Sequence, residues 1–585
     1  MSFSREFRRL VRRHGPFLLV FCGFYAVCVV RLLRMSSWNI THDEFFIFDH
    51  ARHLLKTGHF LPGWSIDSVV LVGLPRGVLF ALMTAGSMAL FGVGETAARV
   101  PALVAGAMSA TAVYWFLLRT TEKRVVALLG VVALMFTPLF VRWHFACRFY
   151  SLILFFHVLS TLFLYEGLEG GARAVSAGAH EQESGAGGIV GRLGREGVQP
   201  GYLFLFALVF VLNLNQHLAL LLFVPAVSVY GMVMLGGDLW RLAVGGAGGE
   251  ESEVRVHLKY LVLSSILPLC IVVIALSLTW PEGALVRSVP LLEKIPFMLR
   301  ENFDIGLGRR HFHLLHVLFP WPMSPVLVGI CAVGALSSGW FAPGPYRKVG
   351  PFLGVTFLFV LVTGVLGWID YMPRYGVYML AMYVPLLALG VCVLGAGMVW
   401  LWRRSGIPGA PEKGVRARYA CALFLMIVLQ TLLLTSGRLI HLGFVNPFGR
   451  VDYETGYGIL YRNLRGGDYV LMCFFRRWYA DHMMRRNGVE SGDYELETFH
   501  GEKKLSRRQL LEAVGSHRRG WVVWARQKSW LLSDAAIEFC REHLEAHHTA
   551  DGTVCVYSWS PALFPPDAGG GSQPGGSNDR EGGER

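Results

Sequence analysis

The sequence predicts a mainly α-helical, polytopic membrane protein with a small α/β domain near its C-terminal end. Apolar residues make up 53% of the 585 residues and charged residues only 16%, and the mean hydropathy is +0.45. A soluble domain carries about 25% charged residues, so this composition excludes a disordered chain and an ordinary cytosolic enzyme. The apolar residues recur in runs close to the ~20 residues that a membrane-spanning helix requires.

The charge and the cysteines exclude two further classes of protein. The net charge is +13, but no nucleic-acid-binding motif accompanies it. In a membrane protein such an excess of Lys and Arg is typical of cytoplasmic loops, so we expect no nucleic-acid partner. The ten cysteines show neither a CxxC pair nor a zinc-ligand spacing. The sequence therefore indicates neither a metal cage nor a disulfide scaffold.

The first predicted span is the apolar run Gly15–Leu33. Five arginines precede it within residues 1–14, and no small-residue cleavage site follows it. We therefore expect a retained helix rather than a removed signal peptide, with the N-terminus in the cytoplasm. Ten further runs bring the total to about eleven: Ala97–Leu118, Val125–Val141, Phe149–Tyr165, Gly201–Leu214, Leu218–Leu235, Tyr260–Leu278, Leu314–Leu336, Pro351–Trp368, Tyr375–Trp402 and Tyr419–Ser436.

The apolar run Gly77–Phe91 allows two topologies. If it spans the membrane, the basic loops around Arg119 and residues 403–418 fall outside the cell. If it lies along the outer surface, the same loops fall inside, as the positive-inside rule prefers. We therefore expect residues 35–96 to form one large outer loop. The C-terminal domain then lies in the periplasm or outside the cell, and the membrane is the plasma or inner membrane.

Three segments outside the spans differ in composition. Glu166–Pro200 is rich in Gly, Ala and Ser and predicts a flexible cytoplasmic insertion, and residues 565–585 predict a disordered tail. Residues 446–560 have the charge density of a soluble domain. There, Tyr469–Phe475, Trp521–Arg526 and Val554–Trp559 predict strands, and Glu454–Leu464, Ser506–Val514 and Asp534–Leu544 predict helices. Cys473, Cys540 and Cys555 of this domain are expected either to pack as apolar thiols or to include one disulfide.

Adjacent carboxylates, Asp43 and Glu44, follow the first span directly. In the residues that follow, apolar side chains recur at helical spacing and polar side chains fall on the opposite side. This pattern predicts an amphipathic helix in the membrane interface, which Gly58 ends. In one interpretation the carboxylates merely favour a helix N-terminus. In the other, a carboxylate at the membrane surface acts as a general base for an acceptor hydroxyl.

The segment from Asp43-Glu44-Phe45-Phe46 to Gly58-His59-Phe60 resembles the first-loop motif of GT-C membrane glycosyltransferases. The resemblance is to the branch of protein O-mannosyltransferases, aminoarabinose transferases and Rgt-type transferases. Three later segments, Leu90–Leu103, Ala146–Leu152 and Arg374-Tyr375 with Pro385, are similar to later motifs of that family in the same order. The resemblance covers roughly residues 1–440. It implies a GT-C-like fold with two surface helices in the first outer loop.

This resemblance implies an inverting transfer of a sugar from a polyprenyl-phosphate donor to a glycan, lipid or protein acceptor. Asp43 would be the base, and Glu44 would assist or position it. The donor-phosphate lysine of the family is missing where this chain has Leu74-Pro75-Arg76, and whether Arg76 replaces it stays open. Arg374 and Arg148 are either phosphate ligands or interfacial side chains. We expect His42, Tyr150, His217 and Tyr375 to line the substrate cavity. The second outer loop lacks the acidic motif of metal-dependent members, so we expect no metal and no cofactor. A transporter or lipid flippase and an inactive GT-C-shaped scaffold are the alternatives.

Overall fold

The computed structural model describes residues 2–34, 42–59, 77–170, 193, 196–217, 220, 222–245, 257–265, 324–337, 347–365, 373–405, 414–435, 453–473, 484–485, 488–489, 493–499, 504–525, 531–547 and 554–563. The chain divides into two compact units, Met1–Pro447 and Phe448–Arg585.

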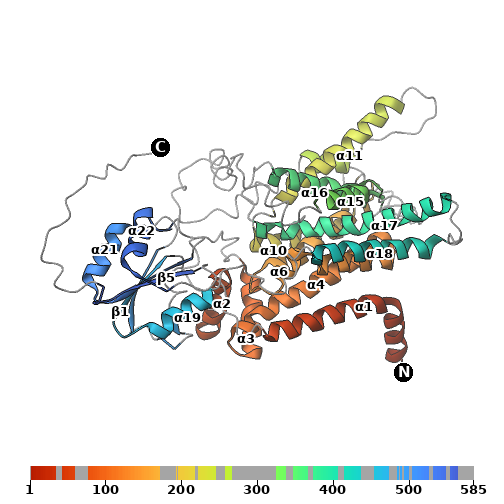
Figure 1. The fold of residues 1–585 in the computed structure, drawn as a ribbon. Helices are drawn as coiled ribbons and strands as arrows, with labels where there is room; N and C mark the ends of the chain where they lie inside the picture. The colour runs from red at the N-terminus through yellow and green to blue at the C-terminus, as the bar shows by residue number, and fades with distance from the viewer. Residues whose placement is uncertain are drawn as a thin grey trace. The chain divides into compact units, whose positions relative to one another are not determined.

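The first unit is a bundle of helices (Figure 1). Its helices are α1 (Ser2–Arg34), α2 (His42–Thr57), α3 (Val78–Phe91), α4 (Glu95–Thr121), α5 (Arg124–Met135), α6 (Pro138–Trp143), α7 (Tyr150–Tyr165) with a π-helical continuation η3 (Glu166–Gly170), α10 (Pro200–Gln216), α11 (Phe223–Gly245), residues 258–265, α15 (Ser324–Ser337), α16 (Val349–Val365), η8 (a 3₁₀ helix, Pro373–Met379), α17 (Leu380–Arg404) and α18 (Gly414–Thr435).

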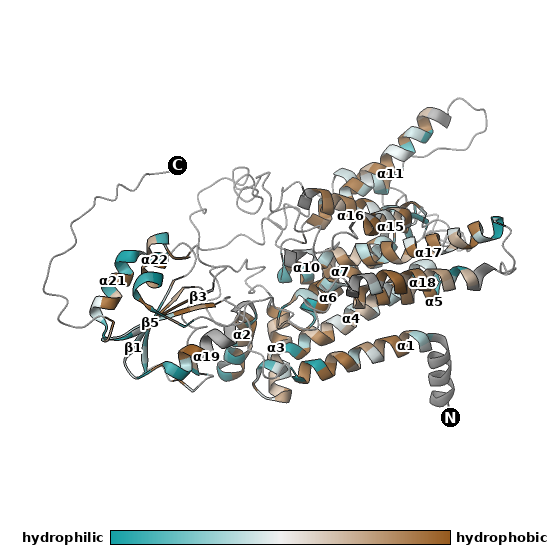
Figure 2. Cartoon of the chain, viewed as in Figure 1, coloured by the Kyte–Doolittle hydropathy of each residue, from teal (hydrophilic) through white to brown (hydrophobic). Residues whose placement is uncertain are grey.

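Hydrophobic residues run along the helices of the bundle (Figure 2). Leu19 of α1, Phe204 of α10 and Trp240 of α11 are each at least 70% exposed. Large exposed apolar surface of this kind marks a membrane or protein contact rather than a face in water. Among the described residues, five helices are long and apolar enough to cross a membrane, and six shorter apolar helices accompany them. The chain is therefore an integral membrane protein, whereas the count of about eleven spans stays a prediction.

Two predicted segments differ in the structure. The expected span Val125–Val141 is split into α5 and α6, because Pro138 lacks the backbone N–H that would continue the helix. Thr137 before it is extended, as the residue before a proline usually is. The expected flexible loop Glu166–Pro200 begins with residues that are instead buried and helical in η3. Residues 171–192 of that loop and the tail 565–585 lie outside the described residues.

The helices α2, α3 and α4 pack successively at one end of the bundle (Figure 1). We call this the α2 end. The 14 residues of α3 measure about 21 Å along the helix axis, which is short of the ~30 Å hydrocarbon core of a membrane. The helices α5 and α15, which lie in expected spans, are as short, with 12 and 14 residues, so the surface position of Gly77–Phe91 stays a prediction. The side of the membrane remains a prediction.

The second unit is a small α/β domain. Its strands are β1 (Asp468–Cys473), β2 (Tyr494–Thr498), β3 (Gly520–Ala525), β4 (Glu545–Ala546) and β5 (Val554–Trp559), and its helices are α19 (Tyr453–Asn463), α21 (Arg507–Ser516) and α22 (Asp534–His543). The sheet order is β2-β1-β3-β5-β4. The strand pairs β1–β2 and β1–β3 are parallel, and β3–β5 and β4–β5 are antiparallel.

Local sequence signals explain this domain. Ser506 and Gln509 form a reciprocal capping box at the start of α21, and the indoles of Trp521 and Trp559 fill the core. All three predicted strands and all three predicted helices are confirmed within one or two residues. The short strands β2 and β4 were not predicted. Cys473 and Cys540 are buried free thiols, as the apolar alternative expects.

Candidate functional site

Hydrogen bonds hold the carboxylate of Glu44, the described side chain of the Asp43-Glu44 motif. Its carboxylate is 1% exposed and accepts two hydrogen bonds from Arg99, at 3.0 Å from Nε and 3.2 Å from a terminal nitrogen. The backbone N–H of Cys147 donates a third bond at 2.8 Å. Arg99 is completely buried. This pair is therefore a bidentate, solvent-inaccessible ion pair, which fixes the relative position of the two side chains as well as compensating their charges.

The Glu44–Arg99 pair joins three separate parts of the sequence. Glu44 lies in the first turn of α2, Arg99 in the first turns of α4, and Cys147 in the turn between α6 and α7. The first-loop motif and two of the three later motifs that resemble the GT-C pattern thus meet at the α2 end. Asp43 is the neighbour of Glu44 in the same turn of α2, so this pair fixes the backbone that carries the predicted base.

The helix α2 follows its predicted amphipathic pattern in part. Ile47, Phe48 and Ala51 are buried as expected, but Leu55 is 40% exposed. At Gly58 the backbone φ is +74°, and its N–H donates to the carbonyl of Leu54 at 2.8 Å. This left-handed conformation suits glycine and ends the helix at Thr57, as predicted.

A second group of predicted site residues gathers around Phe149. The guanidinium carbon of Arg148 lies 5.0 Å from the Phe149 ring centroid and 5.7 Å from that of Tyr150. The His217 ring lies 6.3 Å from Phe149, and Tyr150 packs against Trp143 at 4.5 Å. Tyr150 and His217 are buried. The structure thus brings together Arg148, Tyr150 and His217 from the start of α7 and the end of α10.

Gly77 links the first loop to this group. Its N–H donates to the carbonyl of Asn215 at 2.9 Å, and its φ is +73°. A Cβ atom at this position would lie 3.0 Å from the Phe149 ring, so the close approach requires glycine. The backbone that follows Arg76 therefore runs directly against Phe149.

Five predicted site residues have side chains outside the described residues. Arg76 is one of them. His42 and Asp43 belong to α2, and Arg374 and Tyr375 to η8, only through their backbones. Their roles as base, phosphate ligands and cavity residues stay predictions.

Sequence reasoning quoted Arg99 within a motif but gave it no role. The available signal was a cation five residues into an apolar helix, because such a charge inside a bundle is normally paired. Sequence reasoning also missed His157 of α7. This residue is completely buried, with its ring edge-on to Phe223 at 4.7 Å and to Tyr378 at 5.7 Å.

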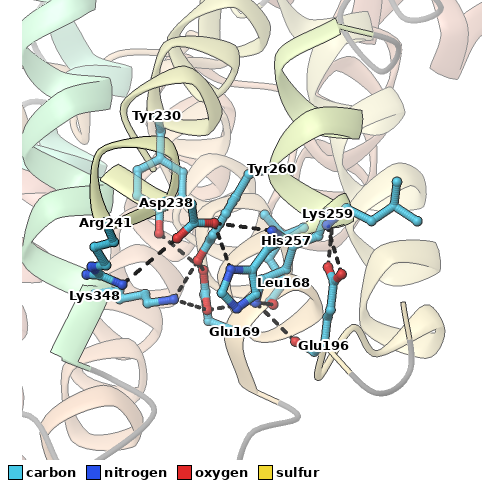
Figure 3. A network of polar contacts seen from close by, with 11 residues as sticks. Leu168, Glu169, Glu196, Tyr230, Asp238, Arg241, His257, Lys259, Tyr260 and Lys348 are labelled. Atoms are coloured by element: carbon cyan, nitrogen blue, oxygen red, sulfur yellow. Dashed lines mark hydrogen bonds and ion pairs between the residues drawn. The ribbon is translucent and has the colours of Figure 1, made fainter. Parts of the chain in front are cut away.

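A second polar network lies at the other end of α7, around Glu169 (Figure 3). Its carboxylate accepts from Lys259 at 2.9 Å and from Tyr260 at 2.6 Å, with Tyr230 and Lys348 further out at 3.3 and 3.4 Å. Lys259 also donates to the carbonyls of Leu168 and Glu196. These bonds use all three ammonium hydrogens. The network is internally satisfied and joins helix ends, so we assign it to stability.

The α2 end thus combines the start of α2, which the Glu44–Arg99 pair holds in place, with Arg148 among aromatic rings and the buried side chains of Tyr150 and His217. Guanidinium groups recognise phosphate through paired hydrogen bonds, and aromatic rings with neutral polar groups suit an organic substrate. Within the described residues, no group of three or more His, Cys, Asp or Glu side chains could hold a metal ion. The independence from metal stays a prediction.

Residues 75–179 match the family of dolichyl-phosphate-mannose-protein mannosyltransferases. This match confirms the resemblance to GT-C glycosyltransferases that the motifs predict. No curated protein matches the chain.

Distant likenesses exist among solved structures. ArnT from Cupriavidus metallidurans bound to undecaprenyl phosphate is 14% identical, with a TM-score of 0.46 over 94% of this chain and 99% of that chain. Its apo state is 11% identical, with a TM-score of 0.44 over 93% and 98%. The apo oligosaccharyltransferase of Archaeoglobus fulgidus is 12% identical, with a TM-score of 0.47 over 92% and 74%. TM-scores below 0.5 leave these as distant likenesses only.

Proposed function

We propose that the chain is a GT-C-type membrane glycosyltransferase that takes its sugar from a polyprenyl-phosphate donor. The acceptor is a hydroxyl or amine of a glycan, lipid or protein at the outer face of the plasma or inner membrane. The observation that carries this proposal is the buried Glu44–Arg99 pair, which fixes the Asp-Glu motif against the turn before α7. The family match over residues 75–179 supports the same assignment, because that family is described by a polyprenyl-phosphate sugar donor.

In the proposed reaction, Asp43 accepts the proton of the acceptor group. The acceptor atom attacks the anomeric carbon in line with the bond to phosphate, so the configuration inverts as the C–O bond to phosphate breaks. The polyprenyl phosphate is a good leaving group and needs no general acid. Glu44 does not carry the proton in this scheme, because Arg99 and Cys147 already hold its carboxylate. It positions the start of α2.

The leaving phosphate gains negative charge, which a preorganised cation stabilises in a site that excludes water. Arg148 suits this role because its guanidinium lies at the start of α7 over two aromatic rings. We assign Arg374 and Arg76 to the same phosphate. The reaction is proposed to need no metal and no cofactor besides the donor lipid.

The experiment that tests this proposal is transfer by the purified full-length chain in proteoliposomes. The donors are undecaprenyl and dolichyl phosphates that carry a radiolabelled hexose or pentose, and the acceptors are a lipopolysaccharide, a lipid and a peptide fraction. The proposal predicts covalent label on one acceptor and release of polyprenyl phosphate. Movement of the labelled donor between leaflets without any covalent transfer would instead identify a flippase.

A further inference from the structure

The α2 end contains buried polar atoms that the proposed mechanism does not use. Among the described residues, the Tyr150 hydroxyl, both ring nitrogens of His157 and both amide atoms of Asn213 are buried without a hydrogen-bond partner. His157 and Asn213 are completely buried. A buried polar group without a partner destabilises a protein, so it usually marks a ligand, a water or a functional role.

These three side chains belong to one region of the bundle. Tyr150 and His157 are seven residues apart, so they lie on the same face of α7, about 10 Å apart along its axis. Helical side chains lean toward the N-terminus of their helix, which for α7 is the α2 end. Phe223 connects His157 to α10, because its ring lies 4.7 Å from His157 and 6.3 Å from Phe210.

Asn213 lies three residues beyond Phe210, hence one turn closer to the α2 end on the same side of α10. The buried polar side chains of α7 and α10 therefore lie within about two turns of the helix ends that carry Arg148 and His217. Tyr378, whose ring lies 5.7 Å from His157, belongs to the η8 segment.

Two other buried polar side chains on α7 are satisfied locally. The Thr161 hydroxyl donates to the carbonyl of His157 at 2.7 Å, and the Ser151 hydroxyl donates to that of Trp143 at 3.3 Å. Within the described residues, the Ser160 hydroxyl, like Tyr150 and His157, is buried without a partner, so α7 carries satisfied polar positions beside these three unsatisfied ones.

The chemistry of the three side chains identifies a class of ligand. A phenol, an imidazole and an amide are neutral and donate or accept hydrogen bonds. A phosphate would require a cation, and Arg148, which lies 5.7 Å from the Tyr150 ring centroid, is a cation beside this group. Neutral hydrogen-bonding groups between aromatic rings suit a ring that carries hydroxyl groups and presents an apolar C–H face.

We propose that Tyr150, His157 and Asn213 form a subsite that binds the sugar ring of the lipid-linked donor, below the phosphate. This subsite rests on the proposed function. His157 and Asn213 are then specificity residues that hydrogen-bond sugar hydroxyls, and their unsatisfied state without donor is the cost of that recognition. A site built to hydrogen-bond a hydroxyl also rejects donors that lack it.

The test measures thermal unfolding of the purified full-length chain in detergent with undecaprenyl phosphate alone and with undecaprenyl phosphate bearing mannose, glucose or arabinose. The variants are His157→Phe and Asn213→Leu, and Thr161→Val is the matched control on the same helix. Without ligand, both variants should melt at a higher temperature than the parent, because each removes an unsatisfied polar group. Both should keep the response to bare undecaprenyl phosphate.

The parent chain should gain further stabilisation from at least one sugar-bearing lipid. In each variant the concentration of that lipid at half-saturation should rise about tenfold, as expected for one lost hydrogen bond, whereas Thr161→Val should change neither quantity. The subsite is overturned if both variants melt lower without ligand, if they keep the full sugar response, or if no sugar on the panel adds to the response of the parent. A parent chain that ignores undecaprenyl phosphate itself refutes the proposed donor class, and the subsite falls with it.

Discussion

Removing one partner of the Glu44–Arg99 pair should strongly destabilise the α2 end. In Glu44→Leu, the Arg99 guanidinium would stay fully buried without its carboxylate, and the Cys147 N–H would lose its acceptor. Breaking a buried ion pair in this way costs about 3–5 kcal/mol. Removing both charges in Glu44→Leu/Arg99→Leu leaves no isolated charge, so most of that loss should return. Denaturant unfolding in detergent, followed by circular dichroism and by tryptophan fluorescence, measures both variants.

The control for this prediction lies on the same helix. Arg52 and Asp49 form a partly exposed pair three residues apart on α2, and such pairs contribute about 0–1 kcal/mol. Arg52→Ala should therefore change the free energy of unfolding little. The reasoning is refuted if Glu44→Leu costs no more than Arg52→Ala, or if the double variant is no more stable than Glu44→Leu.

Three further predictions concern topology, donor binding and the soluble domain. A topology reporter fused after Ser560 should give a signal outside the cytoplasm, and a cytoplasmic signal would mean that Gly77–Phe91 crosses the membrane. Arg374→Lys should lower kcat/KM for the donor, because the planar fork is lost although the charge stays; unchanged steady-state kinetics would assign Arg374 to the membrane interface alone. Burial raises the pKa of the Cys540 thiol to about 12 and that of Cys473 well above its ordinary value. Mass spectrometry after iodoacetamide treatment at pH 8 should therefore find both thiols unmodified until urea unfolds the domain. Prompt labelling would contradict their burial.

The sequence predicted the elements of the small domain well because each carries its own local signal. Val554–Trp559 is a run of β-formers, and its bounds match β5. Ser506 precedes a predicted helix and caps it. The two-residue strand β4 has no such signal, because it exists only through its pairing with β5.

The candidate site was predictable only as a set of motifs. Asp43-Glu44 identified the start of α2, but no local pattern indicates that Glu44 would pair with Arg99, 55 residues away. Long-range pairing of this kind depends on how helices pack rather than on propensity. The same holds for Glu169, which local composition placed in a flexible loop. Its partner Lys259 is 90 residues further along the chain and holds that segment in the bundle.

The most direct test of the account is the turnover of Asp43→Asn in the proteoliposome transfer assay. Asparagine keeps the size of the side chain and also suits a helix start, so the variant should fold and reach the membrane. It cannot accept a proton at neutral pH. General-base catalysis contributes roughly 100- to 10,000-fold, so the account predicts that turnover falls by about that factor while donor binding and thermal stability stay close to those of the parent. Transfer by Asp43→Asn at the parent rate would contradict the central claim and leave Asp43 as a residue of the helix start alone.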